Sequence, residues 1–148
     1  MYREFRDSQQ KMFDDFADKN AFFAFNDEQF EEGLKKLGIR GRKTESVSKN
    51  LVHAGAGMYL WKSAVPEYKS LISQLDKELR EKMQNKRFAE EAFYYELGNH
   101  EYCITFDPEP AIEALGYTVD EVIADKKLFN AWCVAKRKYI AECEQRGW

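Results

Sequence analysis

The sequence predicts an α+β fold, in which a mostly helical single domain, residues 1–148, packs on a small, mostly antiparallel sheet. Long stretches place apolar residues three and four apart, which is the spacing of amphipathic helices. Shorter aromatic or β-branched stretches near glycines are typical of strands. The chain has 148 residues, of which 44% are hydrophobic and 15% aromatic, enough for one hydrophobic core.

The first third predicts a helix, a strand and a second helix. Residues 2–19 place apolar side chains on one helical face. The stretch 21–25 is short, continuous and aromatic, which favours a buried strand. Asn26 and Gln29 match a capping box, in which Gln29 would bind the Asn26 N–H, and Gly38 predicts the end of that helix. The face of the first helix comprises Phe5, Met12, Phe13 and Phe16.

Residues 35–49 are strongly basic and predict a loop, because glycines and serines interrupt them. Such a segment is either a solvated loop or a contact for phosphates or a partner. The candidate phosphate contacts are Arg40, Arg42 and Lys43.

The middle of the chain predicts a β-hairpin and a long helix. Strands 51–54 and 58–62 flank Gly55 and Gly57, which suit a turn or bulge. A phosphate-binding glycine loop is disfavoured, because no Lys-Ser/Thr pair follows. Ser63 is expected to cap a helix over about 64–84, whose stripe would face the core or a dimer partner. That stripe comprises Val65, Tyr68, Ile72, Leu75, Leu79 and Met83.

The last third predicts helices around one uncertain strand. A helix over 87–99 is followed by 102–106, whose alternation is compatible with a strand that Pro108 and Pro110 would end. Two short helices follow, the second opening with a capping box at Thr118 and Glu121. Asp125 is expected to cap a final helix over 126–145. Its predicted buried face comprises Leu128, Phe129, Trp132, Ala135, Tyr139, Ile140 and Cys143.

Charge is segregated along the chain. Residues 89–125, called here the acidic segment, contain ten carboxylates, and all 23 Lys and Arg residues lie outside it. Unless the basic loop or Lys126, Lys127 and Lys136–Lys138 neutralise it, this segment predicts a surface that attracts basic partners. The expected partner-binding residues are Glu90, Glu91, Tyr94, Glu109, Glu113, Asp120 and Glu121.

A second hypothesis is a metal-dependent enzyme. Glu96 and His100 are four residues apart and share a helix face, as two metal ligands would, with Glu101 and His53 as further candidates. No established metal-binding signature accompanies them. The alternative is structural, with His100 satisfying buried backbone groups and Glu96 pairing with Arg87 or another base. The sequence assigns no catalytic residue and no cofactor.

Other function classes are weaker. Cys103 follows His100 closely, but its acidic surroundings disfavour a reactive thiolate. The three cysteines lack a CxxC pair, and a reduced, cytoplasmic chain explains them best. No apolar run is long enough to span a bilayer. A net charge of −3 argues against a wholly basic nucleic-acid binder, although the basic loop keeps that alternative open.

Three blocks of the sequence resemble a family of small, uncharacterised proteins associated with tailed-bacteriophage genomes. They are Phe22–Gly33, Gly55–Tyr59 and Tyr95–Tyr102. Two positions depart from the pattern, Gly98 in place of Ala and Met58 in place of Gly. The resemblance implies a phage or prophage origin and no known activity. By analogy, an accessory protein of this size would bind and inhibit a host protein, such as a defence nuclease, as a monomer or homodimer.

Overall fold

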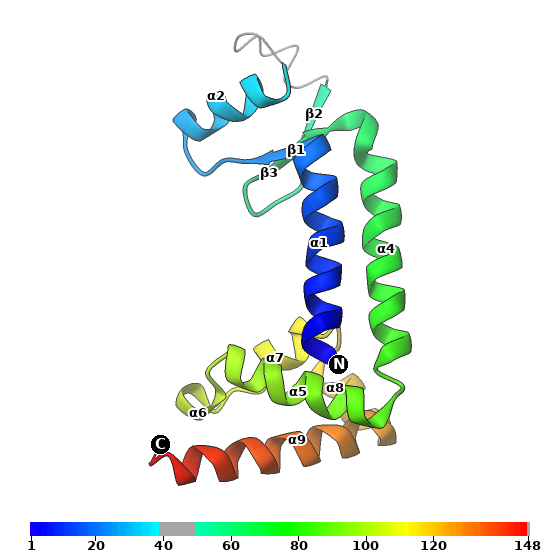
Figure 1. Cartoon of the computed structure of the whole chain (residues 1–148), viewed down its shortest axis with the longest axis vertical. Helices are drawn as coiled ribbons and strands as arrows, with labels where there is room; N and C mark the ends of the chain where they lie inside the picture. The colour runs from blue at the N-terminus through cyan, green and yellow to red at the C-terminus, as the bar shows by residue number, and fades with distance from the viewer. Residues whose placement is uncertain (39–49, 148) are drawn as a thin grey trace. The chain divides into compact units, whose positions relative to one another are not determined.

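The computed structural model describes residues 1–38 and 50–147 and confirms the α+β class (Figure 1). Helices account for most of the described residues, and three strands form one antiparallel sheet. The elements are α1 Tyr2–Asn20, β1 Ala21–Phe23, α2 Asp27–Lys36, β2 Leu51–His53, β3 Met58–Trp61, the 3₁₀ turn η1 Lys62–Ala64, α4 Val65–Lys82, α5 Lys86–Asn99, α6 Tyr102–Thr105, α7 Glu109–Ala114, α8 Val119–Ala124 and α9 Lys126–Gln145.

The chain divides into two compact units. The sheet unit is Ser8–Gln74, and the helical unit combines Met1–Asp7 with Leu75–Trp148. Helices α1 and α4 therefore each contribute residues to both units. That the two units fold as one domain stays a prediction.

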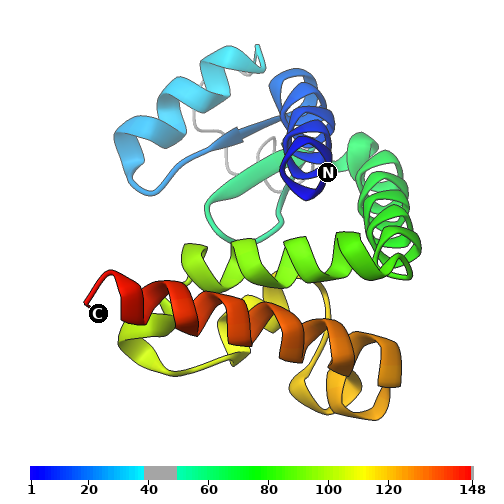
Figure 2. The same ribbon diagram turned by 60° about the horizontal axis from the view of Figure 1, so that its bottom comes forward.

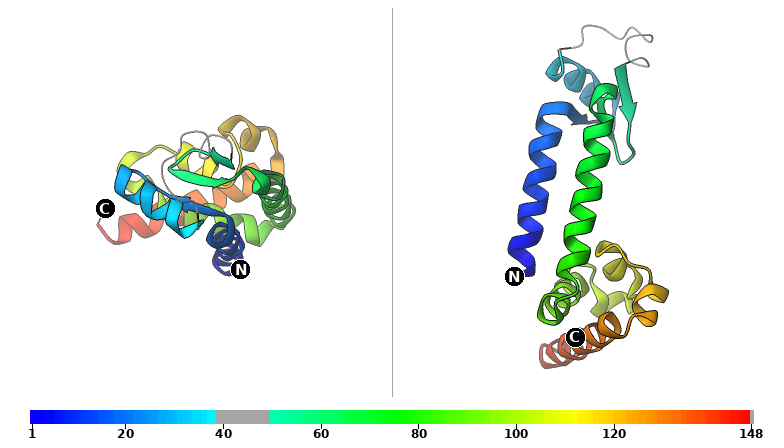
Figure 3. Two further views of the ribbon diagram at one scale, coloured as in Figure 1. Left: turned by 90° about the horizontal axis from the view of Figure 1, so that it is seen from above. Right: turned by 90° about the vertical axis from the view of Figure 1, so that its right-hand side faces the viewer.

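In the sheet unit, the strand order is β1-β3-β2, and both pairings are antiparallel. The predicted hairpin of β2 and β3 is confirmed, and Gly55 and Gly57 have φ values of +91° and +75° in its turn (Figure 3). These left-handed conformations favour glycine. Ala21 and Leu60 face each other across β1 and β3, and both side chains are fully buried.

Helix α2 begins with the predicted cap. The Asn26 side chain accepts a hydrogen bond from the Gln29 N–H at 2.8 Å. The reciprocal bond differs from the prediction, because Gln29 Oε1 accepts from the Phe25 N–H, not from that of Asn26. Gly38 follows the helix with a φ of +77°, as expected of a residue that ends a helix.

In the helical unit, α5 packs along α9, and α6, α7 and α8 connect them in the chain (Figure 2). Asn85, Thr118 and Asp125 each accept a hydrogen bond from a backbone N–H three residues later, which caps α5, α8 and α9. The core is one cluster of aliphatic and aromatic side chains. Its largest fully buried members are Phe93, Met83, Leu97, Ile112, Leu115 and Val122.

The strand predicted at 102–106 is wrong, because this stretch forms the short helix α6. No strand is found in the described part of the helical unit. Without a neighbouring strand, the backbone hydrogen bonds of this stretch are made within a single helical turn. Tyr102 is buried, whereas Ile104 and Phe106 face solvent.

Three further predictions about helices need correction. Ser63 does not cap the long helix, because it lies inside η1. Ile72 on α4 and Phe129 on α9 were expected inward but are 40% and 41% exposed. Their spacing fits the apolar faces, but a helix face buries only those positions that another element covers.

Candidate functional site

The most enclosed polar cluster surrounds Glu96 of α5, which is 2% exposed. Its carboxylate accepts hydrogen bonds from the Tyr2 hydroxyl at 2.6 Å and from Asn99 Nδ2 at 3.2 Å. Arg6 Nε lies at 3.5 Å, and His100 Nε2 at 3.2 Å. Both carboxylate oxygens are therefore occupied by groups of the protein itself, which a buried carboxylate requires.

The hypothesised metal ligands are only partly brought together. Glu96 and His100 meet on α5, as their spacing predicts. Glu101 is exposed and directly precedes α6 with a φ of +53°, and His53 belongs to the sheet unit, where its ring stacks on Tyr59 at 4.5 Å. Across residues 1–38 and 50–147, no group of three His, Cys, Asp or Glu side chains is placed to hold a metal ion.

Arg6 pairs with Glu96, which agrees with the expectation of Arg87 or another base and shows that the arginine is not Arg87. The Arg6 guanidinium also lies over the Tyr95 ring, 5.4 Å from its centroid. Burial and the hydrogen bond to Glu96 raise the pKa of Tyr2. The first turns of α1 are thus fixed to α5 by polar contacts.

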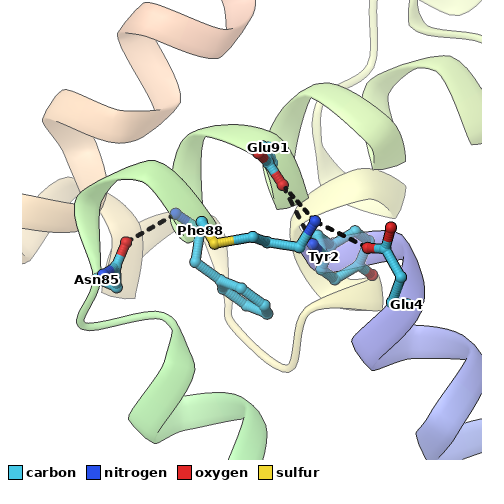
Figure 4. A network of polar contacts seen from close by, with 6 residues as sticks. Tyr2, Glu4, Asn85, Phe88 and Glu91 are labelled. Carbon is cyan, nitrogen blue, oxygen red and sulfur yellow. Dashed lines mark hydrogen bonds and ion pairs between the residues drawn. The ribbon is translucent and has the colours of Figure 1, made fainter.

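Glu91 makes a second contact between α1 and α5 (Figure 4). Its carboxylate accepts a hydrogen bond from the Tyr2 N–H at 3.1 Å, and it lies 3.3 Å from the Met1 ammonium group. The backbone hydrogen bond from Tyr2 is the main reason why the pKa of Glu91 is lowered. The Tyr2 ring packs edge-on against Phe88 at 5.6 Å.

Three of the predicted partner-binding residues, Glu90, Glu91 and Tyr94, line one groove of about 340 Å³. Each already has a partner within the protein. Glu90 lies 4.0 Å from Lys86, and the Tyr94 hydroxyl donates a hydrogen bond to Glu142, which raises the pKa of Tyr94. These three residues of the predicted binding surface therefore already make contacts within the helical unit.

The remaining predicted partner-binding residues lie on α7 and α8. Glu109, Glu113 and Asp120 are exposed, and none makes a side-chain hydrogen bond or ion pair with any described residue. Glu121 differs, because its side chain accepts from the Thr118 N–H at 3.1 Å and completes the capping box. It is thus part of the α8 terminus.

The acidic segment therefore separates into two groups. Six carboxylates bind backbone or side-chain groups of the protein: Glu90, Glu91, Glu96, Asp107, Glu121 and Asp125. Four others, called here the unpaired carboxylates, have no such partner among the described residues: Glu101, Glu109, Glu113 and Asp120. In the same part of the chain, no Lys or Arg of α9 forms an ion pair with the acidic segment.

The candidate phosphate contacts Arg40, Arg42 and Lys43 lie outside the described residues. At the near end of the basic loop, Lys36 Nζ donates a hydrogen bond to the Ala21 carbonyl at 3.0 Å. That lysine connects α2 to β1.

One exposed apolar feature was not predicted from the sequence. Ile104 and Phe106 are 71% and 72% exposed, and Ile104 lines a groove of about 540 Å³. The groove is also lined by Tyr94, Tyr95 and Tyr139. The sequence was interpreted as compatible with a strand here, although Ile104 and Phe106, four and two residues before Pro108, were a signal that the segment could end at the surface.

The cysteines do not form a nucleophilic pair with histidine. The Cys103 N–H donates to the Tyr139 hydroxyl at 3.4 Å, and burial raises the pKa of Cys143. Cys143 is buried in the core as predicted, whereas Cys133 is half-buried.

A family model described as "Family of unknown function (DUF7659)" matches residues 1–138. The chain belongs to this family. In this DUF7659 member, the matched residues include the Glu96 cluster, the groove at Glu90, Glu91 and Tyr94, and the four unpaired carboxylates. No curated protein and no solved structure matches the chain. Within the described residues, no helix is both long and apolar enough to cross a membrane.

Proposed function

We propose that this DUF7659 protein acts without catalysis, by binding another protein through an acidic surface of its helical unit. The proposed setting is a phage-type accessory protein in the host cytoplasm. The proposed partner is a host protein, such as a defence nuclease, which the binding inhibits. The setting is supported by the resemblance of the three sequence blocks, and the binding mode by the side chains of the acidic segment.

The observation that carries the proposal is the set of unpaired carboxylates, Glu101, Glu109, Glu113 and Asp120. Like charges on one unit repel each other. Carboxylates without cationic partners therefore stabilise the folded protein little or not at all. The same charges accelerate encounters with a positively charged partner and favour its orientation. A binding role therefore accounts for these residues better than a structural role.

Inhibition of a nuclease would follow from competition. A nuclease channel that holds nucleic acid is lined by Lys and Arg, which neutralise phosphates. A carboxylate surface that binds those cations excludes the nucleic acid. Glu109, Glu113 and Asp120 would make these contacts, because their side chains are exposed.

The test is capture of partner proteins from a bacterial host lysate by the tagged protein. The test variant combines Glu109→Lys, Glu113→Lys and Asp120→Lys. The control variant combines Asp15→Lys, Asp18→Lys and Glu32→Lys, which are exposed carboxylates of the sheet unit. Both variants change the net charge by the same amount. Glu121 is left unchanged, because its side chain belongs to the capping box of α8.

We expect the wild type and the control variant to capture the same stoichiometric host protein, and the test variant to lose it. Circular dichroism should show that both variants keep the helical content of the wild type. Equal capture by all three proteins would refute the acidic surface as the binding site. Turnover of a substrate by the purified protein would refute the non-catalytic role.

A further inference from the structure

Helix α6 presents large apolar side chains to solvent. Ile104 and Phe106 are more than two-thirds exposed, at 71% and 72%. Both lie within four residues of the buried Tyr102, whose ring packs edge-on against Phe106 at 6.2 Å. Neighbouring exposed apolar residues of this size, next to a groove, indicate an interaction site more often than isolated ones do.

The backbone at α6 is poorly explained by stability alone. Glu101 precedes the helix and Phe106 ends it, and both have left-handed φ values, +53° and +55°. A left-handed conformation is energetically unfavourable for a residue other than glycine. Asn or Gly would adopt it more easily at both positions. An exposed Phe in this conformation therefore favours a contact role for its ring.

The groove beside α6 has the dimensions of a binding site. Its volume is about 540 Å³, and its walls include Ile104 and the rings of Tyr94, Tyr95 and Tyr139. Grooves of a few hundred Å³ with aromatic walls are suited to a side chain of a peptide or a small ligand. Tyrosine and exposed apolar anchors are also the residues in which protein interfaces are enriched.

The charges around this groove select one kind of occupant. Glu101 lines it and is one of the unpaired carboxylates, and Asp107 and Glu109 lie one and three residues after Phe106. Arg146 is the cation among the lining residues, and it already has an interaction within the protein. A partner side chain that enters beside Glu101 is therefore favoured if it is positively charged.

We infer that the groove beside α6 binds a short segment of a partner protein, which inserts one large apolar side chain and places a Lys or Arg next to Glu101. This inference rests on the proposed protein-binding function and names the chemistry of the partner. Ile104, which lines the groove, and Phe106, which caps α6 two residues later and is not a lining residue, contact the apolar side chain, and Glu101 pairs with the cation. Tyr94, Tyr95 and Tyr139 form the walls.

The direct test is a titration of the isotope-labelled full chain with a synthetic probe, a Gly-Ser peptide that carries one Trp between two Lys residues. We expect NMR shift changes centred on α6 and on Gly98 and Asn99 of α5. Replacing both Lys by Glu, or Trp by Ala, should weaken binding at least about tenfold, which corresponds to about 1.4 kcal/mol.

Variants locate the site. Ile104→Ser and Phe106→Ser should each weaken probe binding severalfold, and Glu101→Lys should remove the preference for the Lys peptide over the Glu peptide. The control is Ile123→Ser, since Ile123 is a 60% exposed apolar residue of α8 and belongs neither to the groove nor to α6 and its C-terminal cap Phe106. Shift changes away from α6, or equal losses in the control, would overturn the inference.

The same variants separate this inference from the proposed function. If Ile104→Ser and Phe106→Ser bind the probe weakly but still capture the host protein, the groove is not where the partner binds. If they lose the partner while the triple lysine variant on α7 and α8 keeps it, the groove stands and the acidic surface fails. If they alter only the self-association of the chain, measured by light scattering, the occupant is a second copy, and the inference is wrong.

Discussion

At the scale of single residues, Glu96 connects the beginning of α1 to α5. A buried carboxylate is tolerated only when its oxygens have partners, and here four side chains provide them. Removing one partner leaves an unsatisfied buried acceptor, which costs more than the hydrogen bond itself contributes. The cluster therefore fixes the start of α1 to α5, and the contribution of each side chain to stability can be tested by a single substitution.

Tyr2→Phe should lower the free energy of unfolding by about 1–3 kcal/mol, because Glu96 loses a buried donor. The control is Tyr94→Phe, which also removes a tyrosine hydroxyl, here the donor of a hydrogen bond from the half-buried Tyr94 to Glu142. We expect the control to cost less than about 1 kcal/mol. Urea unfolding measures both values, and equal effects would contradict the structural role of Glu96.

A pH dependence is expected from Glu91. The hydrogen bond from the Tyr2 N–H lowers the pKa of this carboxyl in the folded protein. A lowered pKa stabilises the fold above the ordinary pKa of Glu, about 4.3, and the contribution is lost as the pH falls through the folded value.

The Glu91→Gln variant should therefore melt below the wild type at neutral pH. The two melting temperatures should converge as the pH falls through the lowered pKa of Glu91, where the wild-type carboxyl becomes protonated. The difference at neutral pH should be small, because Glu91 is half-exposed and solvent screens its charge. A difference that persists at acidic pH would mean that the charge of Glu91 is not responsible.

At the scale of secondary-structure elements, helix α2 approaches strand β1 closely at Gly33. A Cβ atom added at Gly33 would lie 2.0 Å from the Phe22 ring. Phe22 is itself buried, packed against Phe30 and stacked on Tyr59 at 5.4 Å. The ring has little room to move, so only glycine lets α2 approach β1 this closely.

Gly33→Ala should therefore destabilise the sheet unit by at least about 1 kcal/mol, as overpacking does. Gly98→Ala in α5 is the matched control, because the Cβ of the new alanine would make ordinary van der Waals contact with Tyr139 at 3.8 Å. Alanine inside a helix is favoured over glycine by about 0.5–1 kcal/mol, so this variant should be more stable than the wild type. Thermal unfolding of both variants checks the signs, and destabilisation by Gly98→Ala would contradict this packing.

At the scale of the whole molecule, the mild net charge of −3 conceals a strong separation of charge along the sequence. Interactions within the helical unit use six of the ten carboxylates of the acidic segment and leave four without a partner there. The carboxylates that remain available to a partner are therefore fewer than the composition suggests. Because these charges are exposed, the affinity of the proposed binding should fall as the salt concentration rises.

Partner capture should weaken as salt rises from about 0.05 M to 0.5 M, because the Debye length shrinks well below 10 Å. The reason is that exposed carboxylates attract a basic partner over distances that counterions screen. Affinity measured by biolayer interferometry at several salt concentrations checks this. Salt-independent affinity would indicate that apolar contacts, such as those of Ile104 and Phe106, carry the binding alone.

The sequence by itself determined the features that depend on near neighbours. The cap at Asn26, the capping box of Thr118 and Glu121, the cap at Asp125 and the glycine turn of the hairpin all follow from residues within four positions. Helix stripes were predicted for the same reason. Such signals are local, so they appear in the sequence as fixed spacings.

Only the tertiary structure decided which side chains meet and which remain exposed. One partner of Glu96 is Tyr2, 94 residues away, and no local spacing indicates that contact. The stretch 102–106 alternates like a strand, but it becomes a helix because no strand lies beside it in the described part of its unit. Charge alone likewise did not separate Glu121, which caps a helix, from Glu113, which has no partner among the described residues. Long-range packing sets these outcomes, since burial and pairing depend on the elements that the fold brings together.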